Sequence, residues 1–184
     1  MYTTSSQTIG PYLHIGMDWA VDPDFAGPEV KGERISVTGR IVDGDGKPVN
    51  DAMLEIWQAN SHGRYAHPED TRDMPLDASF MGWGRVTTDE EGRFRFNTIK
   101  PGQVPATDGS LQAPHLNVTL FMRGMLKQLL TRIYFDGDAA NARDPVLARV
   151  PQARRSTLMA RPAAGVLEWN IVLQGERETV FFDI

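Results

Sequence analysis

The chain has 184 residues, enough for one domain with a substantial core and too few for two. Its hydrophobic content of 41% and charged content of 23% are those of an ordinary globular protein, and a net charge of -5 offers no basic face for a nucleic acid. The absence of cysteine excludes a disulfide scaffold, a zinc site with Cys ligands and a thiol nucleophile.

The chain begins MYTTSSQTIG, which lacks the basic region and the apolar run of a signal peptide. No apolar stretch approaches the length that is needed to span a membrane. We therefore expect a cytoplasmic protein. The patterns that follow along the chain are mostly those of short strands separated by turns.

The first clear strand pattern is RISVTGRIV, residues 34–42. Its apolar or small residues fall on one face and its Arg, Ser and Thr residues on the other; the first set is Ile35, Val37, Gly39 and Ile41. DGDGK, residues 43–47, is predicted to be a turn, because Asp and Gly tolerate positive φ. DAMLEIWQA, residues 51–59, is predicted to be the next strand, and we expect the two strands to pair as one hairpin.

The segment GRVTTDEEGRFRFNTIKPG, residues 84–102, repeats this arrangement, with Asp89 to Gly92 as its turn. Its second half alternates aromatic and basic residues, so we expect Phe94 and Phe96 on one face and Arg93 and Arg95 on the other. Residues 60–83 form a long irregular loop, and loops of this length in a compact domain are usually functional or interfacial.

Four further strands are predicted, in HLNVTLF, LTRIYFD, VLEWNIVLQG and ETVFFDI, which occupy residues 115–121, 130–136, 166–175 and 178–184. A short helix is expected within residues 138–161, where Pro151 suits a first helical turn. Short strands separated by turn signals favour a mainly β protein. We expect a single-domain antiparallel β-sandwich with long loops and little helix.

The strand PHLNVTLF, residues 114–121, carries the first candidate for chemistry. Because side chains alternate along a strand, Leu116, Val118 and Leu120 face the core and His115, Asn117 and Thr119 face the other way. Ligands at i and i+2 lie about 6.5–7 Å apart, close enough to hold one ion. Imidazole binds iron well, whereas a neutral amide is a poor ligand for a trivalent ion. His115 is thus either half of a metal site or a lone histidine in a hydrogen-bonded pocket.

The stretch WQANSHGRYAHPED, residues 57–70, carries the second candidate. Trp57 ends a strand, and Tyr65 lies in the following loop between His62 and His67. A strongly Lewis-acidic ion could convert Tyr65 to a phenolate ligand. The alternative is a tyrosine that packs its ring and hydrogen-bonds its hydroxyl group.

In this order and spacing, six segments resemble the intradiol ring-cleaving dioxygenases over nearly the whole chain. They are SQTIGPYLHIG (6–16), DAMLEIWQANSHGRY (51–65), TIKPG (98–102), APHLNVTLFMRG (113–124), LTRIYFDGDAANARDPVL (130–147) and IVLQGERETVFFDI (171–184). The family fold is a β-sandwich, which agrees with the strand pattern. The resemblance implies one domain over residues 1–184, with residues 1–30 as an N-terminal arm.

The resemblance also identifies the positions where iron-binding members hold ferric iron with two Tyr and two His. The first Tyr matches Tyr65 and the first His matches His115, while the second Tyr falls near Val104 and the second His falls on Asn117. Gln112 stands where those members carry an Arg. Half of the ligand set is missing, so we expect these four positions to be vestigial and this chain to bind no metal.

One branch of the family pairs two homologous chain types, and RGMLKQLLTRIYFD (123–136) resembles the α type. The resemblance implies a hetero-oligomer in which a homologous β chain binds all of the Fe(III). The implied substrates are 3,4-dihydroxybenzoate (protocatechuate) and O2, and the implied product is 3-carboxy-cis,cis-muconate.

In such an assembly the α chain contributes residues to the shared substrate pocket. Thr8, Gly10 and Pro11 of the N-terminal arm are one candidate set, because Gly permits close backbone approach and Pro stiffens the arm; the arm could equally serve only to dock the partner. Arg132 is the other candidate, because a guanidinium suits a benzoate carboxylate. An interchain salt bridge is the alternative for Arg132.

Two other functions stay open from the sequence. A noncatalytic β-sandwich binding module with a vestigial site would need neither a partner nor iron. A self-sufficient iron enzyme would need altered ligands, such as His62 or His67. The colour of the purified chain distinguishes the iron enzyme from the binding module, because an intact tyrosinate–ferric site is reddish.

Overall fold

The computed structural model describes residue 16, residues 21–106 and residues 108–183. Eleven strands lie in this part of the chain: β1 (Arg34–Val42), β2 (Met53–Trp57), β3 (Trp83–Thr87), β4 (Arg93–Ile99), β5 (Val104–Pro105), β6 (Leu111–Gln112), β7 (His115–Phe121), β8 (Leu129–Phe135), β9 (Met159–Ala163), β10 (Val166–Glu168) and β11 (Ile171–Val172). Three short 3-10 helices stand between β8 and β9: η2 (Ala139–Arg143), η3 (Leu147–Arg149) and η4 (Gln152–Leu158).

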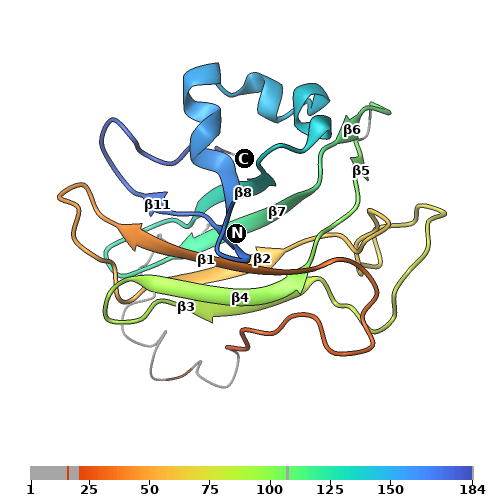
Figure 1. Cartoon of the computed structure of the whole chain (residues 1–184), viewed down its shortest axis with the longest axis horizontal. Coiled ribbons are helices and arrows are strands. Elements are labelled where there is room, and N and C mark those ends of the chain that lie inside the picture. The colour runs from red at the N-terminus through yellow and green to blue at the C-terminus, as the bar shows by residue number, and fades with distance from the viewer. Residues whose placement is uncertain (1–15, 17–20, 107, 184) are drawn as a thin grey trace, which may run out of the picture.

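The strands form two facing layers, which confirms the sandwich expectation (Figure 1). One layer pairs β4 with β1 and β1 with β10, and the other runs β8–β7–β2–β3. Strand β9 joins them, because its first residues pair with β8 and its last residues pair with β10. Most strand pairs are antiparallel as expected, but β1 is parallel to β10 and β11, and β8 is parallel to β9.

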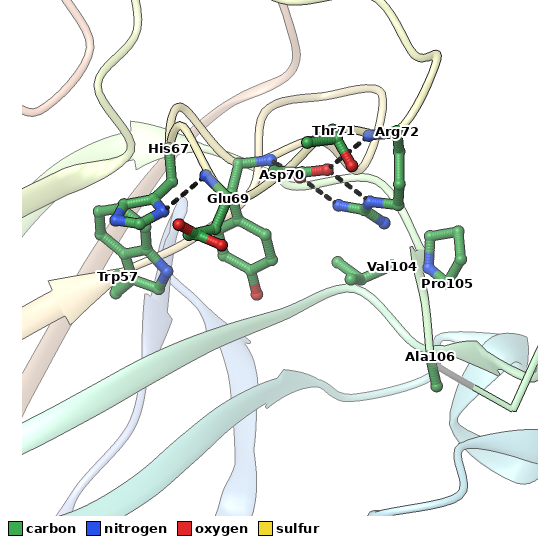
Figure 2. Close-up of a pocket in the computed structure, with 10 residues that line it drawn as sticks. Trp57, His67, Glu69, Asp70, Thr71, Arg72, Val104, Pro105 and Ala106 are labelled. Carbon is green, nitrogen blue, oxygen red and sulfur yellow. Dashed lines mark hydrogen bonds and ion pairs between the residues drawn. The ribbon is translucent and has the colours of Figure 1, made fainter.

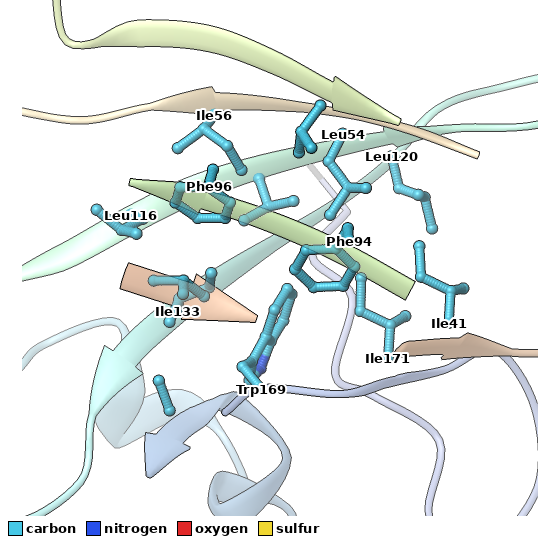
Figure 3. Close-up of a cluster of buried hydrophobic side chains, with 14 of the residues drawn as sticks. Ile41, Leu54, Ile56, Phe94, Phe96, Leu116, Leu120, Ile133, Trp169 and Ile171 are labelled. Carbon is cyan, nitrogen blue, oxygen red and sulfur yellow. The ribbon is translucent and has the colours of Figure 1, made fainter. Parts of the chain in front are cut away.

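The main core lies between the two layers (Figure 3). Phe94 and Phe96 of β4 are buried there, and Trp169 packs edge-on to Phe94 with ring centroids 6.3 Å apart. The predicted alternation of β4, β1 and β7 is confirmed, since Leu116, Val118 and Leu120 are all completely buried. Each such side chain contributes about 1.5–3 kcal/mol through removal of apolar surface from water.

The two predicted hairpins are wrong in their pairing, although both turns form. Asp43 N–H donates to Lys47 O in the first turn and Asp89 N–H donates to Arg93 O in the second. However, β1 pairs with β4, and β2 pairs with β3 and β7. Each turn therefore carries the chain between the layers, because β1 and β4 belong to one layer and β2 and β3 belong to the other.

The C-terminal part departs from the predicted strands in two places. The expected strand at residues 166–175 is split into β10 and β11, because Trp169 turns inward and donates its indole N–H to Thr157 O. The expected strand at residues 178–184 is reduced to one bridge, between Leu130 and Phe182. The short helix expected within residues 138–161 is present as three 3-10 segments, and Pro151 is the N-cap of the last.

Residues 21–30 cover the open side of the sandwich between β3 and β4. The ring of Phe25 stacks on Phe96 with centroids 5.2 Å apart and lies against the backbone of Gly84. Ala26 and Val30 are buried beside it. The helices among the described residues are all too short or too polar to cross a membrane. The single-domain assignment with an arm at residues 1–30 stays a prediction.

Candidate functional site

A hollow of about 790 Å³ opens where β2 ends and the loop of residues 60–83 begins (Figure 2). Residues 60–82 of that loop contain no strand or helix, as predicted, and β3 begins at Trp83. Tyr65 stacks on Trp57 with ring centroids 5.6 Å apart and 7° between the planes, and His67 meets Trp57 edge-on. Val104 and its two successors in the chain form another part of the lining.

A partly buried ion pair between Asp70 and Arg72 fixes the loop around Tyr65. The Tyr65 N–H donates to Oδ2 of Asp70 at 2.8 Å, and Nε of Arg72 donates to Oδ1 of the same carboxylate at 2.7 Å. Arg72 also donates to Gly63 O at 3.0 Å. The hydrogen bond from Arg72 holds the pKa of Asp70 well below its usual range. The loop is thus tied to one conformation without regular secondary structure.

The floor of the site comes from two neighbouring strands. Register places His115 of β7 opposite Tyr134 of β8, and Asn117 opposite Arg132. Alternation puts these four side chains on the face away from the main core. The Asn117 side-chain amide donates to Tyr65 Oη at 3.2 Å and to Trp57 O at 3.3 Å. The strand face and the loop are therefore directly connected.

Arg132 lies within this polar cluster and is half-buried. Its guanidinium donates to Gln112 Oε1 at 2.7 Å and to Tyr134 Oη at 3.4 Å. Burial raises the pKa of Tyr65, while the Asn117 hydrogen bond and the charge of Arg132 act in the opposite direction. Gln112 of β6, at the position where the sequence resemblance leads us to expect an Arg, thus accepts a hydrogen bond from the Arg132 guanidinium of β8.

Asp144 closes the far side of the cluster and is 1% exposed. Its carboxylate accepts hydrogen bonds from Ala113 N–H at 2.7 Å, Val146 N–H at 2.9 Å and Leu147 N–H at 2.6 Å. The hydroxyl group of Tyr134 donates to it at 3.2 Å. This one side chain therefore joins the β6–β7 connection, β8 and the start of η3.

His115 is 1% exposed, and the bonding of its ring defines its tautomer. The ring Nδ1 lies 2.7 Å from Ala113 O, which can only accept, so Nδ1 carries the proton and Nε2 carries the lone pair. Nε2 is buried and has no hydrogen-bond partner among the described residues. Burial, with the charge of Arg132 as a second cause, lowers the pKa of His115 to about 4.

This lowered pKa predicts a loss of stability in mild acid. Between pH 6.5 and 4 the unfolded chain binds a proton at His115 and the folded chain does not, so the free energy of unfolding falls as the pH falls. The loss approaches about 3 kcal/mol. Urea unfolding across this range measures it. His115→Asn, whose amide can still donate to Ala113 O, should flatten the dependence; an unchanged slope in that variant would contradict the assignment.

The structure brings together the four positions that the sequence comparison singled out. Tyr65 and Val104 line one hollow, Asn117 is bonded to Tyr65, and His115 stands two residues before Asn117 on the same strand face. Arg132 lies on the face of β8 opposite to the buried Thr131, Ile133 and Phe135. His67 lines the hollow, whereas His62 does not. Thr8, Gly10 and Pro11 lie outside the described residues.

Sequence reasoning missed four residues that hold the site together: Asp70, Arg72, Tyr134 and Asp144. Asp144 carried a local signal, since an Asp followed by Pro and two apolar residues is typical of an N-cap before a short helix. The other three had no signal, because their roles depend on partners that only the fold brings near.

The donor set does not fit ferric iron. Val104 has no ligand atom, and Asn117 directs an N–H group at the phenol oxygen that an ion would need. The guanidinium of Arg132 adds a positive charge close to both Tyr65 and His115. Within the described ranges, no three His, Asp or Glu side chains gather closely enough to hold a metal ion.

A protein-family model described as Dioxygenase matches residues 18–175. The chain is 42% identical to the protocatechuate 3,4-dioxygenase alpha chain of Burkholderia cepacia, over 98% of this chain and 97% of that one. It is 41% identical to the alpha chain of Pseudomonas putida, over 98% and 96%. The protocatechuate 3,4-dioxygenase beta chain of Burkholderia cepacia is 42% identical, over 82% of this chain and 68% of that one.

Solved structures share the fold. The dioxygenase domain of a dioxygenase and carbohydrate-binding protein fusion from Streptomyces sp. SirexAA-E has a TM-score of 0.64 and 24% identity, covering 97% of this chain and 100% of that one. Catechol 1,2-dioxygenase from Pseudomonas arvilla C-1 has a TM-score of 0.63 and 22% identity, covering 83% and 55%. With the match to the family model and the full-length relatives, these findings show that the chain belongs to the intradiol dioxygenase family.

Proposed function

We propose that this chain is the non-iron-binding α subunit of a protocatechuate 3,4-dioxygenase, which cleaves 3,4-dihydroxybenzoate with O2 to 3-carboxy-cis,cis-muconate. The observation that carries the proposal is similarity to α chains along almost the whole chain, whereas the β chain matches a shorter part. A free-standing binding module would have no reason for such full-length similarity. We place the protein in the cytoplasm.

The proposal divides the work between two homologous chains. The ferric ion, which supplies Lewis-acid chemistry to family members, would be held by the partner chain, because Val104 and Asn117 leave this chain without a matching ligand set. This chain would contribute assembly and part of the wall of the partner's substrate pocket. Thr8, Gly10 and Pro11 belong to that proposed contribution.

Coexpression tests the assembly. With the homologous β chain present, the protein should copurify as a hetero-oligomer. Obligate interfaces commonly bury more than about 2,000 Å², which is enough to hold such a complex together during purification. Exposed apolar side chains such as Met81 and Leu126, 71% and 65% exposed, are available for such contact. Light scattering of the copurified sample measures its mass. Two separate monomers in that measurement would rule out the proposal.

Arg132 gives the sharper test within this function. We propose that the N–H groups not bonded to Gln112 and Tyr134 favour a substrate that bears a carboxylate. A charge-assisted hydrogen bond contributes roughly 1.5–3 kcal/mol, so Arg132→Ala should lower kcat/KM for protocatechuate by about tenfold to a hundredfold. Catechol, which has no carboxylate, should be much less affected.

Iron content of the coexpressed complex is the control for Arg132→Ala and should stay unchanged. Equal losses on both substrates, together with dissociation of the chains, would assign Arg132 to an interchain salt bridge. If neither kinetics nor assembly changes, the substrate role is wrong.

A further inference from the structure

Three arginines surround one hollow on the outer face of the layer that contains β1 and β4. Arg40 of β1 and Arg93 of β4 are direct cross-strand partners, and Arg177 follows β11. All three are exposed and line a hollow of about 490 Å³, called here the Arg hollow. Strand β1 thus presents a polar hollow on the face opposite to the main core.

Within the described chain, no arginine of the Arg hollow forms an ion pair. The ion pairs of the described residues involve other cations, and none of them reaches Arg40, Arg93 or Arg177. One carboxylate, that of Glu168, lines the hollow, and its Oε1 accepts from Asn170 Nδ2 at 2.8 Å. Among the residues that line the hollow there are thus three guanidinium groups and one carboxylate, on a chain of net charge -5.

Direct opposition of Arg40 and Arg93 is unfavourable in the free protein, because like charges on facing residues of adjacent strands repel. Arg40 cannot simply turn away, since its Nε donates to Glu91 O at 2.8 Å. The remaining N–H groups of Arg40 have no acceptor in the described chain. A ligand with several negative oxygens would relieve the repulsion and accept these donors.

We propose that the Arg hollow binds the phosphate group of a small molecule or free inorganic phosphate. Guanidinium groups present paired N–H donors that match the oxygen spacing of phosphate. Two or three of them around a concave surface give a preference for a dianion over chloride. The site is separate from the hollow at Tyr65 and does not depend on the proposed dioxygenase function.

Thermal unfolding of the purified full-length protein tests the proposal. Inorganic phosphate is titrated against sodium chloride at matched ionic strength, and glycerol phosphate is titrated in parallel as a phosphomonoester. We expect Tm to rise with the logarithm of the phosphate concentration above the dissociation constant, by about 3 °C when that concentration is ten times the dissociation constant. Binding of both compounds assigns the site to the phosphate group in general, and binding of inorganic phosphate alone assigns it to the free ion.

Arg93→Gln is the test variant and Arg95→Gln is its matched control. Arg95 lies on the same face of β4, faces Thr38 and lines a neighbouring hollow instead. Arg93→Gln should abolish the phosphate-dependent rise and, at low ionic strength without phosphate, should raise Tm above that of the wild type because the repulsion is removed. Arg95→Gln should retain the full response.

Two results would overturn the proposal. One is an equal effect of phosphate and chloride at the same ionic strength, which indicates general screening. The other is an equal loss of the phosphate response in Arg93→Gln and Arg95→Gln, which indicates a diffuse field over the strand face.

Discussion

Purified without a homologous partner chain, this protein will be colourless and will not cleave 3,4-dihydroxybenzoate. The reason is the donor set around Tyr65, where Val104 offers no ligand atom and Asn117 offers an N–H donor. His115 alone cannot retain a trivalent ion, because the cation of Arg132 is close to its ring. Metal analysis, a visible spectrum and oxygen uptake measure the three parts of this result.

Two comparisons make the result interpretable. The complex coexpressed with the β chain should be coloured and active under the same conditions. A chain that carries both Val104→Tyr and Asn117→His regains the two missing donor types and should retain more iron than the wild type. Close to one tightly bound iron per isolated wild-type chain, lost in His67→Ala, would replace the proposed α-subunit role with an iron site that uses His67.

The largest loss of stability is expected for Asp144→Ala. The substitution removes the acceptor of the Tyr134 hydroxyl group and of three backbone N–H groups; Tyr134, Ala113 and Leu147 are buried, and Val146 is half-buried. Each unsatisfied buried donor costs about 1–3 kcal/mol, and relaxation of the surrounding structure lowers the sum of these costs. We therefore expect the free energy of unfolding to fall by about 3–5 kcal/mol in total. Urea unfolding of the wild type and the variant measures it.

Asp108→Ala is the matched control for Asp144→Ala. Its carboxylate accepts from the backbone N–H and the hydroxyl group of Ser110, but both residues lie at the surface, where water replaces the lost acceptor. We expect a change within about 0.5 kcal/mol. Similar losses of unfolding free energy in the two variants would show that the burial of Asp144 does not determine its contribution to stability.

Local patterns predicted the strands but not their partners. Alternation placed Phe94 and Phe96 inside and Arg93 and Arg95 outside, because this periodicity depends only on the strand itself. The turn at residues 43–47 was also predictable from Asp and Gly. The strands on the two sides of a turn can pair with each other or separate into two layers. Contacts with residues far along the chain decide between these outcomes, and the sequence of the turn does not determine those contacts.

The candidate site was predictable to the extent that it resembled a known ligand set. Tyr65, Val104, His115 and Asn117 were located by that resemblance, and the fold gathers them. The interaction of Arg132 with Gln112 was not predicted, because it requires β6 to lie over the β7–β8 pair. The N-terminal contribution to the pocket of the partner stays a prediction.

The pairing of β1 has a consequence for how the chain folds during synthesis. Arg40 N–H donates to Asn170 Oδ1 across a separation of 130 residues, and Val37 pairs with Leu167. Contacts between residues so distant form slowly, because a long loop must close before they stabilise the chain. Until the last strands leave the ribosome, the nascent protein exposes an unpaired edge of β1, so its earliest vulnerability to aggregation lies there.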